Sequence, residues 1–292
     1  MRSSVRRLLR FRRHRYLSQA GEAGILEEVF RRLGITRGVI LEAGASDGLF
    51  LSNTNQFVGK GHRLIYIESN PDEFQKLQQN FQHHDDVTTL SRHIALAGPD
   101  SLDAIALELG LPGDVDLLVV DIDSYDVAVL RGLESLRPKV AMIEYNPFFL
   151  PSEEYEADSG DIHPSRGGKG SSLGTLYRVA AEKGYQIVCT LNMNAIFVRA
   201  ELLPRIHDRP VTLDESATFE FLPIRDLAPW QILQRAYYLG LSRVLRSLAI
   251  RVGLVPTFQY KNRNISLLLF CCLQLMTSVL VASEKINVIG IC

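Results

Sequence analysis

The sequence has only four cysteines, and they show neither the spacing of a metal site nor that of a disulfide scaffold. Cys189 lies in an apolar run, while Cys271, Cys272 and Cys292 belong to the last segment. Two adjacent cysteines make no plausible disulfide framework, so a reducing compartment is favoured. The basic N-terminus is not followed by the apolar stretch of a secretory signal, and we therefore expect a cytoplasmic protein.

Acidic residues are missing from the first fifteen positions, which carry seven arginines. Because the chain as a whole has a net charge of -1, the remainder is acidic. A basic segment on an acidic body indicates contact with an anionic partner, and a solvated tail is the alternative. We treat residues 1–15 as a basic tail whose partner is an anionic membrane surface, and we expect no nucleic acid.

Strand-like and helix-like patterns alternate from residue 21 onward. Patterns typical of strands occupy residues 39–41, 64–67, 117–120, 140–143, 185–190 and 195–199, and a weaker strand lies near residues 87–96. Helical patterns occupy residues 22–33, the stretch from Asn70 to Phe81, residues 101–109, the stretch with Val127, Leu130 and Leu133, and the stretch from Ser171 or Ser172 to Lys183. This order predicts an α/β, Rossmann-like fold with a mostly parallel seven-stranded sheet, closed by an antiparallel hairpin at the C-terminal end. We assign it to residues 16–225.

Polar residues and glycines gather where the predicted strands end. They are Glu42, Gly44, Gly48, Glu68, Asp121 and Glu144. Ligands of open α/β sheets bind beyond the carboxyl ends of the strands, so a binding site is expected there.

The first turn lacks the middle glycine of a dinucleotide fingerprint. Gly44 and Gly48 allow a tight turn and a close approach to a ligand, although any strand-to-helix turn can use two glycines. Asp47 stands where it would repel a phosphate, and Glu68 can accept hydrogen bonds from ribose hydroxyls. An acidic rim suits a nucleoside with an ammonium and a sulfonium group and no phosphate. The expected cofactor is S-adenosylmethionine, with NAD and an oxidoreductase as a weaker alternative.

Three carboxylates follow the most apolar strand: Asp121, Asp123 and Asp126. Asp121 is expected beside the cofactor, and Asp123 is the favoured general base toward an acceptor hydroxyl. Asp126 is the second catalytic candidate, although an acid at a helix start is favoured by the helix dipole whatever its chemistry. The trio could hold Mg²⁺, but no further ligand stands at an obvious spacing, so no metal site is predicted.

Several stretches together resemble the FkbM-type methyltransferases. They are residues 16–28, 42–48, 52–54, 67–68, 121–126, 143–146, 171–173, 183–185 and 194–199. The resemblance implies a class I methyltransferase domain that methylates a hydroxyl of a sugar, polyketide or related metabolite with S-adenosylmethionine. It also implies that Glu42, Gly44 and Gly48 line the methionine part, that Glu68 holds the ribose, and that Asp121 and Asp123 face the reacting end.

Two positions depart from the family pattern. Ala23 stands where an acid is common, which would loosen an N-terminal lid, and Ser124 stands where glycine is common, which would re-aim the catalytic loop. His163 is the reserve candidate for the base. A methyltransferase-fold module that binds without catalysis, recruited to a membrane or a partner, is the alternative function.

The segment 226–292 is predicted to be a helical, apolar appendage. Residues 230–253 combine arginines with apolar residues, as an interfacial helix does. Residues 265–282 are 18 positions without charge, at the lower limit for a membrane span, although Gln274, Thr277 and Ser278 weaken that interpretation. A buried helix or a dimer contact is the alternative to membrane association.

Overall fold

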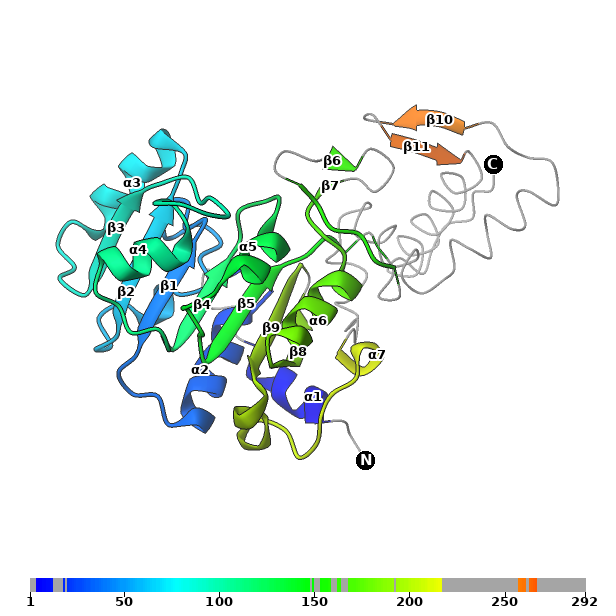
Figure 1. Cartoon of the computed structure of the whole chain (residues 1–292), viewed down its shortest axis with the longest axis horizontal. Coiled ribbons are helices and arrows are strands. Elements are labelled where there is room, and N and C mark those ends of the chain that lie inside the picture. The colour runs from blue at the N-terminus through cyan, green and yellow to red at the C-terminus, as the bar shows by residue number, and fades with distance from the viewer. Residues whose placement is uncertain are drawn as a thin grey trace, which may run out of the picture. The chain divides into compact units, whose positions relative to one another are not determined.

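The computed structural model describes residues 4–12, 18, 20–147, 149, 153–158, 162–163, 168–191, 193–216, 257–260 and 263–266. The chain divides into two units, Met1–Ile162 with Lys169–Thr218, and His163–Gly168 with Phe219–Cys292. The first unit contains the seven-stranded sheet and every helix that is described (Figure 1).

The seven strands of this sheet have the order β3-β2-β1-β4-β5-β9-β8. Their bounds are Val39–Ala43 (β1), Arg63–Glu68 (β2), Val87–Ser91 (β3), Leu117–Val120 (β4), Val140–Glu144 (β5), Tyr185–Leu191 (β8) and Asn194–Arg199 (β9). Strands β1 to β5 pair in parallel, and β9 pairs antiparallel with both β5 and β8. The predicted mostly parallel sheet with a closing antiparallel hairpin is therefore confirmed. Only β3 is clearly shorter than predicted, since the predicted strand continued to residue 96.

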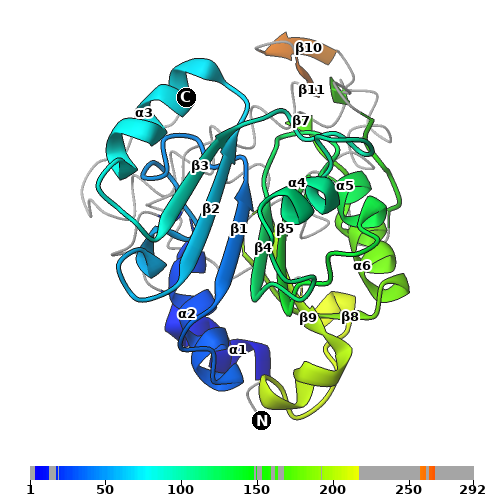
Figure 2. The ribbon, with the colours of Figure 1, turned by 60° about the vertical axis from the view of Figure 1, so that its left-hand side comes forward.

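The longer helices are α2 (Glu22–Leu33), α3 (Pro71–Phe81), α4 (Leu102–Glu108), α5 (Asp126–Gly132) and α6 (Leu173–Glu182). Short helices are α1 (Ser4–Leu8) and α7 (Leu213–Ser216), and 3-10 turns cover Leu9–Phe11, Asn55–Phe57 and Ala200–Arg205. Figures 1 and 2 show α4, α5 and α6 on one face of the sheet. The helices follow the strands as the crossovers of a parallel sheet require.

Side-chain caps start the helices where the sequence predicts. The Asn70 side chain accepts hydrogen bonds from the backbone N–H groups of Asp72 (2.9 Å) and Glu73 (3.3 Å), and Pro71 opens α3. Ser172 caps α6 by accepting from the N–H of Thr175 at 3.2 Å. These caps fix the first turn of α3, which begins shortly after β2, and the first turn of α6.

The central strands are buried on both faces, as parallel strands covered by helices are. Every residue of β4 and β5 is buried, including Glu144 at the end of β5. Since the apolar side chains of these strands fill the core, their polar residues stand only at the strand ends. This places the site at one edge of the sheet.

The two terminal segments differ from their predictions where they are described. Val5, Leu8 and Leu9 are buried in the same core as the sheet, so this part of the basic segment packs against the body instead of standing free. In the second unit, β10 (Thr257–Tyr260) and β11 (Arg263–Ser266) form an antiparallel hairpin where a helical appendage was expected.

Several predictions fall outside the described ranges: the boundary at residue 225, the basic segment 230–253 and the stretch 267–282. Strands β6 (Ile162–His163) and β7 (Gly168–Lys169) form a small sheet, but the side chain of His163 is likewise not described. Within the described ranges, no helix combines the length and hydropathy that a membrane span needs.

Candidate functional site

A cavity of about 520 Å³ opens at the carboxyl ends of the parallel strands. It lies where the strand order turns, because β1 pairs with β2 on one side and with β4 on the other. Five predicted site residues line it: Glu42, Gly44, Glu68, Asp121 and Asp123. The two others, Gly48 and Asp126, do not belong to its lining.

Gly44 follows β1 at the closest point between the turns of β1 and β4. Its φ of +86° suits glycine, and a Cβ there would stand 1.7 Å from the carbonyl oxygen of Asp121. No side chain fits at this position, so the backbone itself forms the wall of the cavity. Gly48 needs to be glycine for another reason. A Cβ at Gly48 would meet the Phe81 ring at 2.3 Å and the Leu77 side chain at 2.7 Å, both on α3.

The carboxylate of Glu68 is held at the end of β2 by two backbone groups. One oxygen accepts from the N–H of Ser46 (2.8 Å) and the other from the N–H of Asn70 (2.7 Å). Each carboxylate oxygen can accept a second hydrogen bond, and Glu68 lines the cavity. The carboxylate is therefore oriented in advance for a pair of hydroxyl donors.

Glu42 is buried within β1 and faces the same cavity. The Thr54 hydroxyl donates to one of its oxygens, and the N–H of Asn53 donates to the other at 3.4 Å. Burial raises the pKa of Glu42 to about 7. Near neutral pH this carboxyl is therefore only partly ionised, and a cation bound beside it would favour its ionised form.

Asp123 and Asp126, both on the loop after β4, have different surroundings. Asp126 is 1% exposed and accepts from the N–H groups of Ile122 (2.7 Å) and Ser124 (3.0 Å). Burial raises the pKa of Asp126 to about 6. Asp123 has a φ of +60° and an exposed side chain that lines the cavity. Asp126 is thus bound by its own loop and does not line the cavity, whereas Asp123 does; the catalytic roles predicted for both remain predictions.

The two departures from the family pattern fit the fold without strain. Ser124 does not have a positive φ, so glycine is not required at this position. Its hydroxyl donates to the carbonyl oxygen of Ile122 at 3.3 Å. Ala23 is fully buried in α2, and its N–H donates to the Ser18 hydroxyl at 3.2 Å.

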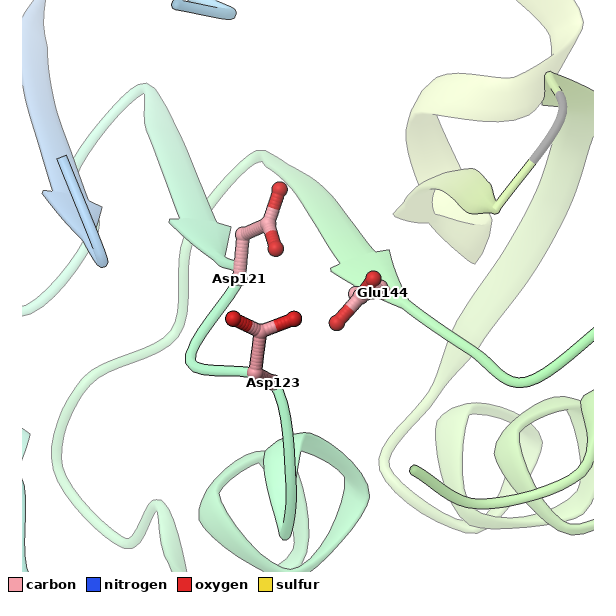
Figure 3. Close-up of side chains that lie close together, drawn as sticks. All are labelled: Asp121, Asp123 and Glu144. Atoms are coloured by element: carbon pink, nitrogen blue, oxygen red, sulfur yellow. The ribbon is translucent and has the colours of Figure 1, made fainter. Parts of the chain in front are cut away.

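Glu144 joins Asp121 and Asp123 in a cluster of carboxylates (Figure 3). One oxygen from each of the three residues lies within 4.8 Å of the others. Burial, followed by the neighbouring negative charges, raises the pKa of Asp121 to about 8 and that of Glu144 well above its usual range. Sequence reasoning placed Glu144 at this edge of the sheet but assigned it no role. Since β4 and β5 pair in parallel, their last residues had to meet.

Sequence reasoning missed a histidine and a tyrosine that also line the cavity. The Tyr125 hydroxyl donates to the carbonyl oxygen of Ile94, and His93 Nε2 lies 3.1 Å from the same hydroxyl oxygen. Because the only hydroxyl proton of Tyr125 is already donated, Nε2 of His93 must be the donor in the second bond. Nδ1 of a neutral His93 is then a hydrogen-bond acceptor. The weaker strand predicted near residues 87–96 concealed His93, and Tyr125 stood in the quoted stretch 121–126 without a role.

Unusual backbone conformations concentrate around the cavity. Ser46, Leu51 and Asp123 have positive φ values without being glycine, and all three line it. Such conformations cost free energy and are typical of ligand sites. Beside Leu51, the Phe50 side chain is 68% exposed at the cavity rim. The rim therefore offers apolar surface to a ligand.

The lining of the cavity is acidic. It contains six carboxylates: Glu42, Glu68, Glu73, Asp121, Asp123 and Glu144. Arg92 is the one arginine or lysine among the described lining residues, and it pairs with Asp100 and Glu108, each at 3.0 Å. Such a lining favours a cationic ligand over one with phosphate groups.

No family model and no curated protein matches the sequence. Among solved structures, the chain is similar to the selenomethionine-substituted CurJ carbon methyltransferase, with 12% identity over 60% of this chain and 52% of that chain, and a TM-score of 0.39. It thus spans about half of the CurJ chain. It is also similar to a SAM-dependent methyltransferase from Aquifex aeolicus (12% identity, 66% of this chain and 96% of that chain, TM-score 0.36). A third similar structure is the N-terminal domain of EvdMO1 in the presence of SAH and D-fucose (13% identity, 61% of this chain and 82% of that chain, TM-score 0.40).

Proposed function

We propose that this chain is an S-adenosylmethionine-dependent class I methyltransferase of the FkbM type, and that it methylates a hydroxyl group of a small-molecule or glycan acceptor. The observation that supports it most is the acidic cavity at the carboxyl ends of β1, β2 and β4, where Gly44 gives backbone access and Glu68 presents a fixed carboxylate.

The residues of this cavity fit the chemical groups of the cofactor. Glu68 would accept hydrogen bonds from both ribose hydroxyls, because the N–H groups of Ser46 and Asn70 fix the orientation of its carboxylate. Glu42 would pair with the ammonium group, and the backbone at Gly44 leaves room for the methionine part. When bound, S-adenosylmethionine supplies a methyl group on a positively charged sulfur, and the negative lining favours that charge.

The acceptor side of the cavity is formed by the loop after β4 and by the apolar rim. Asp123 projects into the cavity from this loop, so its carboxylate can take the proton of an acceptor hydroxyl. Phe50 and Leu51 offer apolar contact to the body of the acceptor. These features support a hydroxyl acceptor with an apolar part, in line with the metabolites that the family resemblance implies.

Calorimetric titration with S-adenosylmethionine, S-adenosylhomocysteine and NAD tests the cofactor. We expect both sulfur nucleosides to bind and NAD to give no heat, because its phosphates would meet the acidic lining. Binding of NAD without binding of the sulfur nucleosides would overturn the proposal. A screen of sugar and polyketide acceptors for S-adenosylhomocysteine formation then separates an enzyme from a module that binds without catalysis, which would bind the cofactor and release no product.

A further inference from the structure

The carboxylates of Asp121, Asp123 and Glu144 converge from three places in the fold. Asp121 directly follows β4, Asp123 lies on the loop beyond it, and Glu144 ends β5 (Figure 3). One oxygen of each lies within 4.8 Å of the others. Among the described residues, no lysine or arginine forms an ion pair with any of the three. The cluster therefore brings three carboxyl groups together without a described cationic partner.

A fourth oxygen ligand is available beside this cluster, from an independent part of the chain. Asn194, the first residue of β9, is the direct cross-strand partner of Glu144 on β5. Directly paired residues of antiparallel strands project from the same face of the sheet, with their Cβ atoms about 5 Å apart. Asn194 lines the same cavity as the three carboxylates.

The side-chain oxygen of Asn194 is buried without a hydrogen-bond partner. The residue is 2% exposed, and its Nδ2 donates to Oε1 of Glu22 at 3.4 Å. This contact fixes the amide with Nδ2 toward Glu22, and no described donor reaches Oδ1. A buried carbonyl oxygen without a partner costs free energy, so its position calls for a ligand that it can bind.

We propose that Asp121, Asp123, Glu144 and Asn194 bind a divalent cation such as Mg²⁺ or Mn²⁺ inside the cavity. All four supply oxygen ligands, which these hard cations prefer. Ligands on opposite sides of such an ion lie roughly 4–5 Å apart, since each stands about 2.0–2.5 Å from the ion. The spacing of the three carboxylate oxygens fits this sphere. Each carboxylate uses one oxygen, so the second oxygen of Asp123 is still available to accept a proton.

Titration of the full chain with Mn²⁺, followed by the paramagnetic resonance signal of the free ion, tests the site without cofactor or acceptor. We expect one Mn²⁺ per chain, displaced by Mg²⁺. Asp123→Asn and Glu144→Gln should each weaken Mn²⁺ binding about tenfold or more, because a charged ligand is replaced by a neutral one. Asparagine is well tolerated at the positive φ of residue 123, so the first variant keeps the fold.

Glu73→Gln is the matched control, since it removes one negative charge from the same cavity lining outside the cluster. It should leave the Mn²⁺ affinity within about threefold of the wild type, because distant charges are screened. Asn194→Ala should weaken Mn²⁺ binding, because it removes the neutral oxygen ligand.

Two results would overturn the site: folded wild-type protein that binds no Mn²⁺, or equal affinities in the Asp123→Asn and Glu73→Gln variants, which would indicate nonspecific binding by the acidic surface. Circular dichroism of each variant confirms that the compared proteins are folded. The titrations with S-adenosylmethionine and S-adenosylhomocysteine test the proposed function without Mn²⁺. Failure of the cation site and failure of the proposed function are therefore distinguishable.

Discussion

Gly44 and Asp121 are in direct backbone contact, so close that a Cβ on residue 44 would stand 1.7 Å from the carbonyl oxygen of residue 121. The contact follows from the pairing of β1 with β4, which ends with Ala43 beside Val120. It joins the loop that supports the proposed cofactor site to the loop that carries the acidic cluster. Any side chain at position 44 would therefore disturb both halves of the cavity.

Gly44→Ala should destabilise the protein by about 2–5 kcal/mol, because the left-handed conformation and the clash both cost free energy. Gly98→Ala is the matched control: its φ is +83°, but a Cβ added there would have no other atom within 4 Å. That variant should lose only about 1–2 kcal/mol for its conformation. Urea denaturation measures both values, and equal losses would show that the contact with Asp121 is unimportant.

Gly48→Ala should also lower stability but should leave the affinity for S-adenosylhomocysteine within about threefold, since residue 48 packs against α3 and does not line the cavity. Phe81→Leu in the same chain removes the ring that the new Cβ meets, so it should recover part of the lost stability. Denaturation and calorimetry together check this prediction. A loss of affinity as large as that of a Glu68 variant would instead return Gly48 to the cofactor site, where the sequence placed it.

The two glycines show what the sequence can and cannot predict. A glycine after a strand indicates a special backbone position, and both Gly44 and Gly48 have positive φ. The sequence does not reveal which atoms approach the missing Cβ, because those belong to the turn after β4 in one case and to α3 in the other. The sheet itself was predictable, since apolar residues dominate its buried strands and capping residues mark the starts of α3 and α6.

Glu68→Gln should weaken S-adenosylhomocysteine binding by about 10- to 100-fold, because a neutral amide replaces a charged acceptor for the ribose hydroxyls. The new NH₂ group would also face the backbone N–H of Ser46 or Asn70, where two donors meet and one hydrogen bond is lost. The stability of the variant should therefore fall as well. Calorimetry is therefore performed where each protein is fully folded. Glu73→Gln, in the same lining, is expected to bind nearly as the wild type does. Unchanged affinity in the Glu68 variant would remove ribose recognition from the proposal.

Glu42 should make stability fall as pH rises from about 4.5 to about 7. Burial raises its pKa from 4.5 to about 7, so in this interval the folded state binds more protons than the unfolded state. The stabilisation of the protonated form is lost above the folded pKa, and the contribution is about 3 kcal/mol at most. The charge of Glu42 also contributes to the raised pKa of Asp121 and of Tyr66, so its removal lowers the pKa of both groups as well.

Glu42→Gln should therefore have a flatter stability profile than the wild type between pH 5 and 8, measured by urea denaturation at several pH values. Glutamine retains one carbonyl oxygen for the Thr54 hydroxyl. Parallel profiles in the two proteins would show that Glu42 does not change its protonation in the folded state over this range.

The sequence predicted where the acidic site lies, but it did not predict which carboxylates form it. Asp121 and Asp123 were expected at the strand edge, where they lie. Asp126 was expected in the cavity, yet two backbone N–H groups of its own loop bind it, and local loop closure cannot be read from residue spacing. Glu144 takes its place in the cluster because β5 neighbours β4, a pairing that depends on the whole sheet.

Asp123→Asn should retain the fold and cofactor binding while methyl transfer falls by about 10²–10⁴, the share expected of a general base. The exposed side chain and the positive φ of residue 123 both accept asparagine. Asp126→Asn should behave differently, because an amide offers only one acceptor to two backbone N–H groups. It should lose stability, and cofactor affinity should fall with the order of the loop.

Single-turnover rates of both variants, measured with an acceptor found by screening, check this assignment. If Asp126→Asn binds cofactor and is inactive while Asp123→Asn stays active, the two roles are reversed. Addition of Mn²⁺ separates the two functions proposed for Asp123. A residue that serves only as a cation ligand loses affinity for the ion, so saturating Mn²⁺ would restore the rate of the asparagine variant. If Asp123 also accepts the hydroxyl proton through its second oxygen, added Mn²⁺ cannot supply that function. We therefore expect the rate of Asp123→Asn to stay low at saturating Mn²⁺.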